Sequence, residues 1–133
     1  QTIKVDAGLP LADAAADYGR RIDNFIDSGG TIELALLGIG GDGHTCSIFS
    51  DEAARDEEST AFPVPGKAGF NRVSIGRRVL LATKRLVFLV SGESKHDILK
   101  KFSDDPLSTW AGIAVKDHPC TELWTDGCKG LVG

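Results

Sequence analysis

One acid and one histidine stand in a glycine-rich stretch, and this pair is the part of the chain best suited to chemistry. Asp42 and His44 flank Gly43, and Gly40 and Gly41 precede them. In a locally extended turn, side chains two residues apart point to the same side. An imidazole can take up a proton near neutral pH and return it, and a neighbouring carboxylate can orient the ring. The pair therefore indicates acid–base chemistry, with the alternative that Asp42 caps the following turn.

Two short apolar runs are expected to position this pair. Residues 34–37 are too few for a helix and run into the glycines, which predicts a buried strand of an α/β sheet. Residues 86–90 form a second such run, followed at once by the turn 91–95 and a predicted helix at 97–102. Because strand, turn and helix recur in this order, we expect both turns at the carboxyl ends of neighbouring parallel strands, in one crevice.

The other elements follow from periodicity and from glycine and proline. Apolar residues recur every three or four positions between Leu11 and Ile26, which predicts an amphipathic helix. A helix is also expected to begin at Thr45–Phe49, with its N-terminal amides facing the glycine turn as an anion or oxyanion site. Weaker patterns predict short helices at 77–83 and 107–110, strands at 2–5, 71–75, 112–115 and 122–124, an exposed connection at 51–58 and a loop or edge segment at 62–66.

Composition limits the class of protein. With 133 residues and 41% hydrophobic content, the chain can bury one modest core, so residues 1–133 are expected to form a single domain. A net charge of -4 without a basic block argues against nucleic acid. No apolar stretch approaches the roughly 18 residues of a membrane span and no signal sequence is evident, so no membrane partner and a cytoplasmic location are expected.

The cysteines and the remaining histidines give no sign of a metal or a cofactor. Three cysteines without Cys-x-x-Cys spacing favour free thiols over a disulfide framework or a zinc site. Neither a metal nor a cofactor is therefore expected. His96 and His118 are expected to be exposed and outside the site.

The glycine-rich stretch also carries a family resemblance. Its sequence, Gly38-Ile-Gly-Gly-Asp-Gly-His-Thr-Cys-Ser-Ile-Phe49, resembles the G-x-G-x-D-G-H-T-x-S-x-F signature of the 6-phosphogluconolactonases. The resemblance implies a mainly parallel, Rossmann-like sheet with helices on both faces. It also implies hydrolysis of 6-phospho-D-glucono-1,5-lactone to 6-phosphogluconate in the pentose phosphate pathway. His44 would be the general base and acid and Asp42 its partner, without a metal.

The resemblance further implies residues that bind the sugar-phosphate substrate. Lys95, in Gly92-x-x-Lys95, is similar to the family lysine that contacts the phosphate, and Arg72 stands at a similar Arg-Val-Ser strand start. Together with the glycine turn, the predicted substrate-binding or phosphate-binding residues are Lys95, Arg72, Gly40, Gly41, Gly43 and Thr45.

The similarity runs from about Leu9 to Val132 and resembles only the C-terminal half of the family domain. The preceding half of the family carries a Ser-Gly-Gly-Ser/Thr phosphate loop and an Asp-Glu-Arg motif, and neither occurs here. A sheet that lacks its first half exposes apolar surface and a strand edge, which predicts a homodimer or a partner that supplies the N-terminal half.

Two other functions remain open. The chain could be a catalytically incomplete half-domain that binds sugar phosphates or oligomerises. It could also be a relative of the amino-sugar-phosphate isomerases and deaminases, which share Gly-x-Asp-Gly-His. This second alternative is less favoured, because no glutamate follows His44 at the deaminase spacing.

Overall fold

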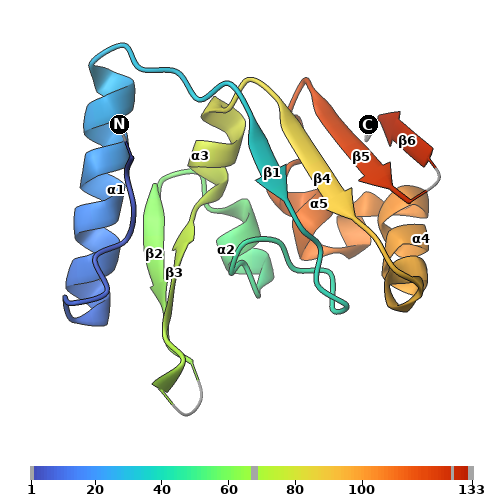
Figure 1. Ribbon diagram of the computed structural model, residues 1–133, viewed down its shortest axis with the longest axis horizontal. Helices are drawn as coiled ribbons and strands as arrows, with labels where there is room; N and C mark the ends of the chain where they lie inside the picture. Colours follow the sequence, from blue (N-terminus) through green and yellow to red (C-terminus); the bar gives the residue numbers. More distant parts are fainter. Residues whose placement is uncertain (1, 67–68, 127, 132–133) are drawn as a thin grey trace.

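The computed structural model describes residues 2–66, 69–126 and 128–131. The helices and strands follow in chain order (Figure 1): α1 (Leu11–Asp27), β1 (Ala35–Leu37), α2 (Asp51–Arg55), β2 (Ala61–Val64), β3 (Arg72–Ile75), α3 (Arg77–Ala82), β4 (Leu86–Val90), the 3-10 turn η2 (Glu93–Lys95), α4 (His96–Asp104), the 3-10 turn η3 (Pro106–Ser108), α5 (Trp110–Ala114), β5 (Thr121–Thr125) and β6 (Cys128–Leu131).

The strands form two sheets. In the larger one the order is β1-β4-β5-β6, with β1, β4 and β5 parallel and β6 antiparallel to β5. Its register places Leu36 beside Val87 and Val87 beside Glu122. The strands β2 and β3 form a separate antiparallel pair, and α1 packs against them. The predicted α/β class and the mainly parallel sheet, with β1 beside β4, are confirmed.

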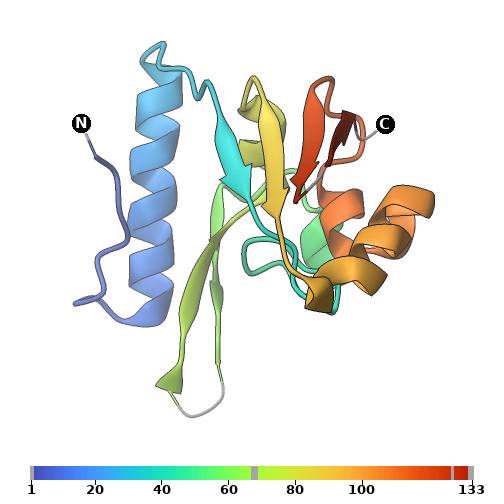
Figure 2. The ribbon, with the colours of Figure 1, turned by 45° about the vertical axis from the view of Figure 1, so that its right-hand side comes forward.

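The core lies on one face of the larger sheet. The helices α2, α3, α4 and α5 all lie behind this sheet in the view of Figure 1, and Figure 2 shows the same arrangement from the side. From β4, Leu86, Phe88 and Val90 point into this layer, because alternate residues of a strand share a face. Phe88 meets Phe102 of α4 edge to face, with ring centroids 4.9 Å apart.

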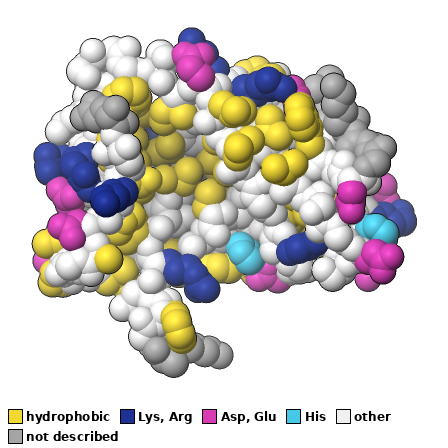
Figure 3. Space-filling model, viewed as in Figure 1, with side chains coloured by type: hydrophobic (Ala, Val, Ile, Leu, Met, Phe, Trp, Pro, Cys, Tyr) yellow, Lys and Arg dark blue, Asp and Glu magenta, His cyan; other side chains and the backbone are white. Residues whose placement is uncertain are grey.

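The opposite face of the sheet is open. Leu36 of β1 and Leu89 of β4 point to this side and are 66% and 59% exposed. Figure 3, drawn in the same view as Figure 1, shows hydrophobic side chains gathered on this face. Of the helical layers that the resemblance places on both faces, the described residues therefore form one. The apolar surface and the free edge of β1 agree with the expectation for half of a domain.

The predicted helix at residues 45–49 is wrong. Thr45 and Ile48 instead bracket a tight turn, in which the Ile48 N–H donates to the Thr45 carbonyl at 3.0 Å. Cys46 has a φ of 52°, a left-handed conformation that a helix cannot contain. The helix α2 begins later, at Asp51, where the Ser50 hydroxyl accepts the Ala53 N–H. No helix N-terminus at residues 45–49 therefore supplies the expected anion site.

The predicted strand at residues 112–115 is also wrong. This short apolar run lies in α5 and its C-terminal cap, since Thr109 caps the helix by accepting the Gly112 N–H at 3.0 Å. A short apolar run is compatible with a helix or a strand, and here the cap made by Thr109 favours the helix. The segment expected to be a loop or an edge near residue 62 is the edge strand β2. Residues 51–55 of the predicted connection are α2, and residues 2–5 form no strand.

His118 is buried rather than exposed. It is 8% exposed and one ring nitrogen, Nε2, lies 2.6 Å from the Thr83 carbonyl, while Nδ1 accepts the Cys120 N–H at 3.0 Å. His118 thus ties the loop before β5 to the end of α3. His96 is exposed, as predicted.

Candidate functional site

The turn that follows β1 is rich in glycine and is closed by two backbone hydrogen bonds. The Gly40 N–H donates to the His44 carbonyl at 2.8 Å, and the Gly43 N–H donates to the Gly40 carbonyl at 2.9 Å. Gly43 has a φ of +91°, which favours glycine. A Cβ on Gly40 would lie 2.1 Å from the His44 ring, so the ring would have to move from its place. The turn therefore needs glycine at these two positions, one for conformation and one for space.

Asp42 and His44 meet at the rim of this turn. The Asp42 Oδ1 lies 2.5 Å from the His44 Nδ1 and also accepts the His44 backbone N–H at 3.2 Å. An ionised carboxylate can only accept, so Nδ1 carries the proton and Nε2 is the ring nitrogen left for chemistry. The expectation that the two side chains share one space is confirmed. Their catalytic roles stay predictions.

The two hydrogen bonds between Asp42 and His44 also affect the pKa of the Asp42 carboxyl. Partial burial raises the pKa of Asp42, but the hydrogen bonds from the ring and the amide of His44 outweigh it and hold the pKa below its ordinary value. Asp42 is therefore a carboxylate at neutral pH.

A phenylalanine and an arginine complete this side of the site. The Phe49 ring lies against the His44 ring, with centroids 4.5 Å apart and planes at 48°. The guanidinium of Arg72, from β3, lies 5.8 Å from the centroid of the Phe49 ring. Arg72 is exposed. Sequence reasoning gave Arg72 a substrate contact but assigned no role to Phe49, although Phe49 ends the family signature.

Lys95 joins the second turn to the first. It ends η2, just after Gly92, and its Nζ donates to the Ile39 carbonyl at 2.8 Å. Ile39 directly precedes Gly40, so the ammonium group lies beside the glycine turn. The turns after β1 and β4 therefore lie next to each other, as expected, and the crevice between them stays a prediction. The phosphate contact of Lys95 stays a prediction.

The remaining predicted binding residues differ in how far a ligand can reach them. Thr45 is 1% exposed, so its hydroxyl points into the protein. The amides of Gly40 and Gly43 donate within the turn. A Cβ on Gly41 would meet nothing within 4 Å, so this position lies in open space. The substrate contacts of these four residues stay predictions.

The helix α5 packs against the turn that follows β1 and supports it. The Ala111 N–H donates to the Gly43 carbonyl at 2.8 Å. A Cβ on Gly43 would lie 3.1 Å from the Thr109 Cβ, so turn and helix are in close contact. The position of His44 therefore depends on the position of α5.

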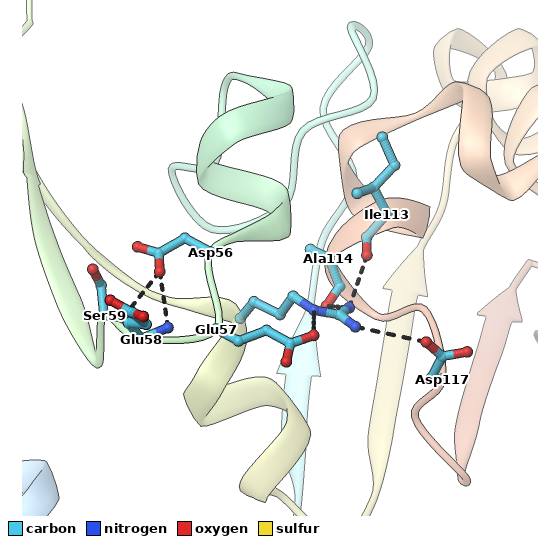
Figure 4. A network of polar contacts seen from close by, with 8 residues as sticks. Asp56, Glu57, Glu58, Ser59, Ile113, Ala114 and Asp117 are labelled. Carbon is cyan, nitrogen blue, oxygen red and sulfur yellow. Dashed lines mark hydrogen bonds and ion pairs between the residues drawn. The ribbon is translucent and has the colours of Figure 1, made fainter.

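A buried arginine holds the other end of α5. Arg77 is 5% exposed, and its Nη1 donates to the carbonyls of Ile113 and Ala114 at 2.9 Å each. Its guanidinium also pairs with Glu57 at 3.1 Å and with Asp117 at 3.9 Å. Figure 4 shows these carbonyls and carboxylates around the guanidinium. Sequence reasoning missed this contact, because nothing local distinguishes Arg77 from its exposed neighbour Arg78.

Two other features lie near the site. Cys46, two residues after His44, is half-buried, and burial raises the pKa of its thiol. A cavity of about 410 Å³ between α2 and β2 is walled in part by Phe49. This cavity also contains Glu52 and Asp56, whose carboxylates would repel a phosphate. Within the described parts of the chain, no group of three acid, histidine or cysteine side chains gathers as a metal site would.

Comparisons with known proteins agree on one family. A family model described as glucosamine-6-phosphate isomerases/6-phosphogluconolactonase matches residues 1–124. A 6-phosphogluconolactonase of Rattus norvegicus is 32% identical over 129 residues, which are 93% of this chain and 50% of the relative. One of Homo sapiens is 34% identical over 110 residues, 79% of this chain and 43% of the relative.

The solved structures give the same picture. The crystal structure of a 6-phosphogluconolactonase from Thermotoga maritima superimposes with a TM-score of 0.70 and 29% identity, covering 91% of this chain and 53% of that one. The chain thus spans about half the length of the curated relatives it matches.

Proposed function

We propose a function from the premise that this chain belongs to the glucosamine-6-phosphate isomerase/6-phosphogluconolactonase family. The chain contributes the acid–base part of a site that hydrolyses 6-phospho-D-glucono-1,5-lactone to 6-phosphogluconate in the pentose phosphate pathway. The observation that carries the proposal is the Asp42–His44 pair, 2.5 Å apart, in the turn at the end of β1. The names of the relatives at 32% and 34% identity support the choice of substrate.

The pair suits hydrolysis of a lactone in two steps. In the first, His44 Nε2 takes a proton from water as the water oxygen bonds to the lactone carbonyl carbon, which gives a tetrahedral intermediate. In the second, the bond from that carbon to the ring oxygen breaks, and Nε2–H returns the proton to the leaving oxygen. The Asp42 carboxylate stabilises the imidazolium between the two steps and keeps Nδ1 protonated.

The positive charge next to the turn suits the phosphate of the substrate. Lys95 places its ammonium beside Ile39, where the two turns meet. A compact ammonium with three donors can keep its bond to a carbonyl and still contact a phosphate oxygen. Lys95 therefore anchors the 6-phosphate, while His44 acts at the lactone end.

The test is hydrolysis of freshly generated 6-phosphogluconolactone, read by coupling the product to 6-phosphogluconate dehydrogenase, with spontaneous hydrolysis subtracted. We expect His44→Ala to lower kcat by about 10² to 10⁴. Lys95→Gln should chiefly raise KM, because it removes a contact made before and during reaction. His96→Ala is the matched control, since His96 is an exposed histidine next to Lys95. Equal rates for the parent chain and His44→Ala, both above background, would refute the mechanism.

A second candidate is a half-domain that binds sugar phosphates without turnover. It is favoured by the open face of the sheet, where Leu36 and Leu89 are exposed, and by the half-length match to the relatives. In this case a homodimer or a polypeptide that supplies the N-terminal half covers that face. Binding of 6-phosphogluconate that depends on Lys95, in a folded sample with background hydrolysis, would favour this candidate.

The place of the reaction is also part of the proposal. Among the described helices, none has the length and apolar character needed to cross a membrane. Cys46 and Cys120 are free thiols, which suits a reducing compartment. We place the chain in the cytoplasm.

A further inference from the structure

We propose that Phe49 is a positioning residue for His44, and that Arg72 acts on His44 through the Phe49 ring rather than by binding phosphate. The inference rests on the proposed function, in which His44 transfers the proton. It assigns a role to Phe49 and replaces the role that the sequence suggested for Arg72.

The His44 ring needs a second constraint besides Asp42. The bond from Nδ1 to the Asp42 carboxylate fixes one edge of the ring, but a single hydrogen bond lets the ring tilt about that contact. The Gly40 backbone lies against one side of the ring, since a Cβ there would be 2.1 Å from the ring atoms. The Phe49 ring, with its centroid 4.5 Å away and its plane at 48°, limits the tilt on its own side. Asp42 and Phe49 together therefore set the direction of Nε2.

Phe49 can do this because β3 holds its loop at two points. The Ser47 N–H donates to the Ser74 hydroxyl at 3.1 Å, and Ser74 is 2% exposed. Arg72 lies two residues before Ser74 in β3, on the same face of the strand, and its guanidinium reaches the Phe49 ring. Ile48, between the two contact points, is fully buried. The loop 47–49 is thus fixed to a strand that is remote from the catalytic pair in sequence.

The Arg72 contact has the geometry of a cation–π interaction. The guanidinium carbon lies 5.8 Å from the ring centroid, inside the roughly 6 Å range over which an arginine is attracted to an aromatic face. The guanidinium lies over the Phe49 ring, and the Phe49 side chain is partly exposed. In this arrangement Arg72 influences His44 only as long as Phe49 is an aromatic ring.

The experiment is a double-mutant cycle of Phe49→Leu and Arg72→Gln in the full chain. We expect Phe49→Leu to lower kcat by about tenfold with KM changed less than about twofold, because a small misplacement of the base slows the chemical step. Arg72→Gln should lower kcat by about twofold to threefold alone and have no further effect in Phe49→Leu. Phe49→Tyr, which keeps the ring, should restore kcat. Phe62→Leu, which lines the same cavity from β2, is the control for lost apolar volume.

A second readout does not need turnover. In the nitrogen-15 NMR spectrum of the histidine side chains, His44 of the parent chain should show a single tautomer with the proton on Nδ1. We expect Phe49→Leu to give a mixture of tautomers, while Phe62→Leu keeps one. An inactive parent chain with this result would refute the proposed function and leave the positioning role intact. An unchanged His44 spectrum and kcat in Phe49→Leu, or a rise in KM from Arg72→Gln in both backgrounds, would overturn the inference.

Discussion

The two turns at the ends of β1 and β4 lie side by side, yet they are built differently. The first turn is held from several sides: by its own amides, by Ala111 of α5 and, through residues 47–49, by β3. The second turn is held by one amide of its own, the Lys95 N–H, which donates to the Gly92 carbonyl at 3.0 Å. The Gly92 N–H also donates to Asp126 at 3.2 Å, and the long side chain of Lys95 reaches the first turn. A rigid turn suits a proton-transfer pair whose angles matter, whereas a flexible lysine suits a charge that follows its ligand.

The variant with the largest expected effect disrupts the first turn and leaves the second intact. Gly40→Ala places a Cβ 2.1 Å from the His44 ring, so the ring must leave its contact with Asp42. We expect a loss of activity of about 100-fold or more. The measurements are the coupled lactonase assay and the His44 side-chain nitrogen spectrum.

Two glycines serve as controls for that variant. Gly41→Ala enters open space and should leave the His44 spectrum as it is in the parent chain. Gly92→Ala lies in the second turn at a φ of +102° and a ψ of 147°, which is nearly restricted to glycine, so it should cost about 1–3 kcal/mol of folding free energy without changing the His44 spectrum. A His44 spectrum in Gly40→Ala equal to that of Gly41→Ala would show that the first turn is less rigid than its contacts indicate.

The next effect concerns the support beneath the first turn. Arg77→Met removes the donors to the carbonyls of Ile113 and Ala114 and leaves these acceptors buried. We expect the free energy of unfolding to fall by about 2–4 kcal/mol, measured by urea denaturation. Arg78→Met is the matched control: its side chain is 49% exposed and pairs with Asp23 at 3.7 Å, a contact worth about 0–1 kcal/mol. Equal losses for both variants would contradict a supporting role for Arg77.

The smallest effect concerns the charge of the acid. In the folded chain the pKa of Asp42 lies below its ordinary value of 3.8, because the hydrogen bonds from His44 outweigh the effect of burial. The ionised form therefore contributes stability above about pH 3.8, and this contribution is lost as pH falls through the lower folded pKa. Because the side chain is half exposed, the contribution is small.

A carboxyl carbon-13 titration tests the sign. His44→Ala should raise the pKa of Asp42 toward 3.8, since the ring hydrogen bond disappears. An Asp42 pKa that is unchanged by His44→Ala would mean that the ring does not bond to the carboxylate in solution.

The sequence predicted the parts of this architecture that depend on local patterns. Short apolar runs before glycines located β1 and β4, and the spacing of Asp42 and His44 indicated that their side chains meet. The helix expected at residues 45–49 failed because Cys46 adopts a left-handed backbone and Ser50 offers a better cap. The strand expected at 112–115 failed because Thr109 caps a helix there.

The rest depends on contacts between distant residues, which no local pattern records. Arg72 lies 23 positions after Phe49 in the chain, and Arg77 is 36 positions from Ile113. From the sequence alone, an arginine is expected to lie on the surface or to bind an anion. Only the fold shows that Arg72 covers an aromatic ring and that Arg77 is buried among carbonyls.

Cys46 gives the site a chemical property of its own. The thiolate is the form of cysteine that oxidants and alkylating agents attack, and burial raises the pKa of this thiol, so Cys46 stays protonated at neutral pH. We therefore expect Cys46, two residues from His44, to react more slowly with peroxide and with disulfides than an exposed cysteine does. The turn that carries Asp42 and His44 thus contains a cysteine that behaves chemically as a small apolar side chain.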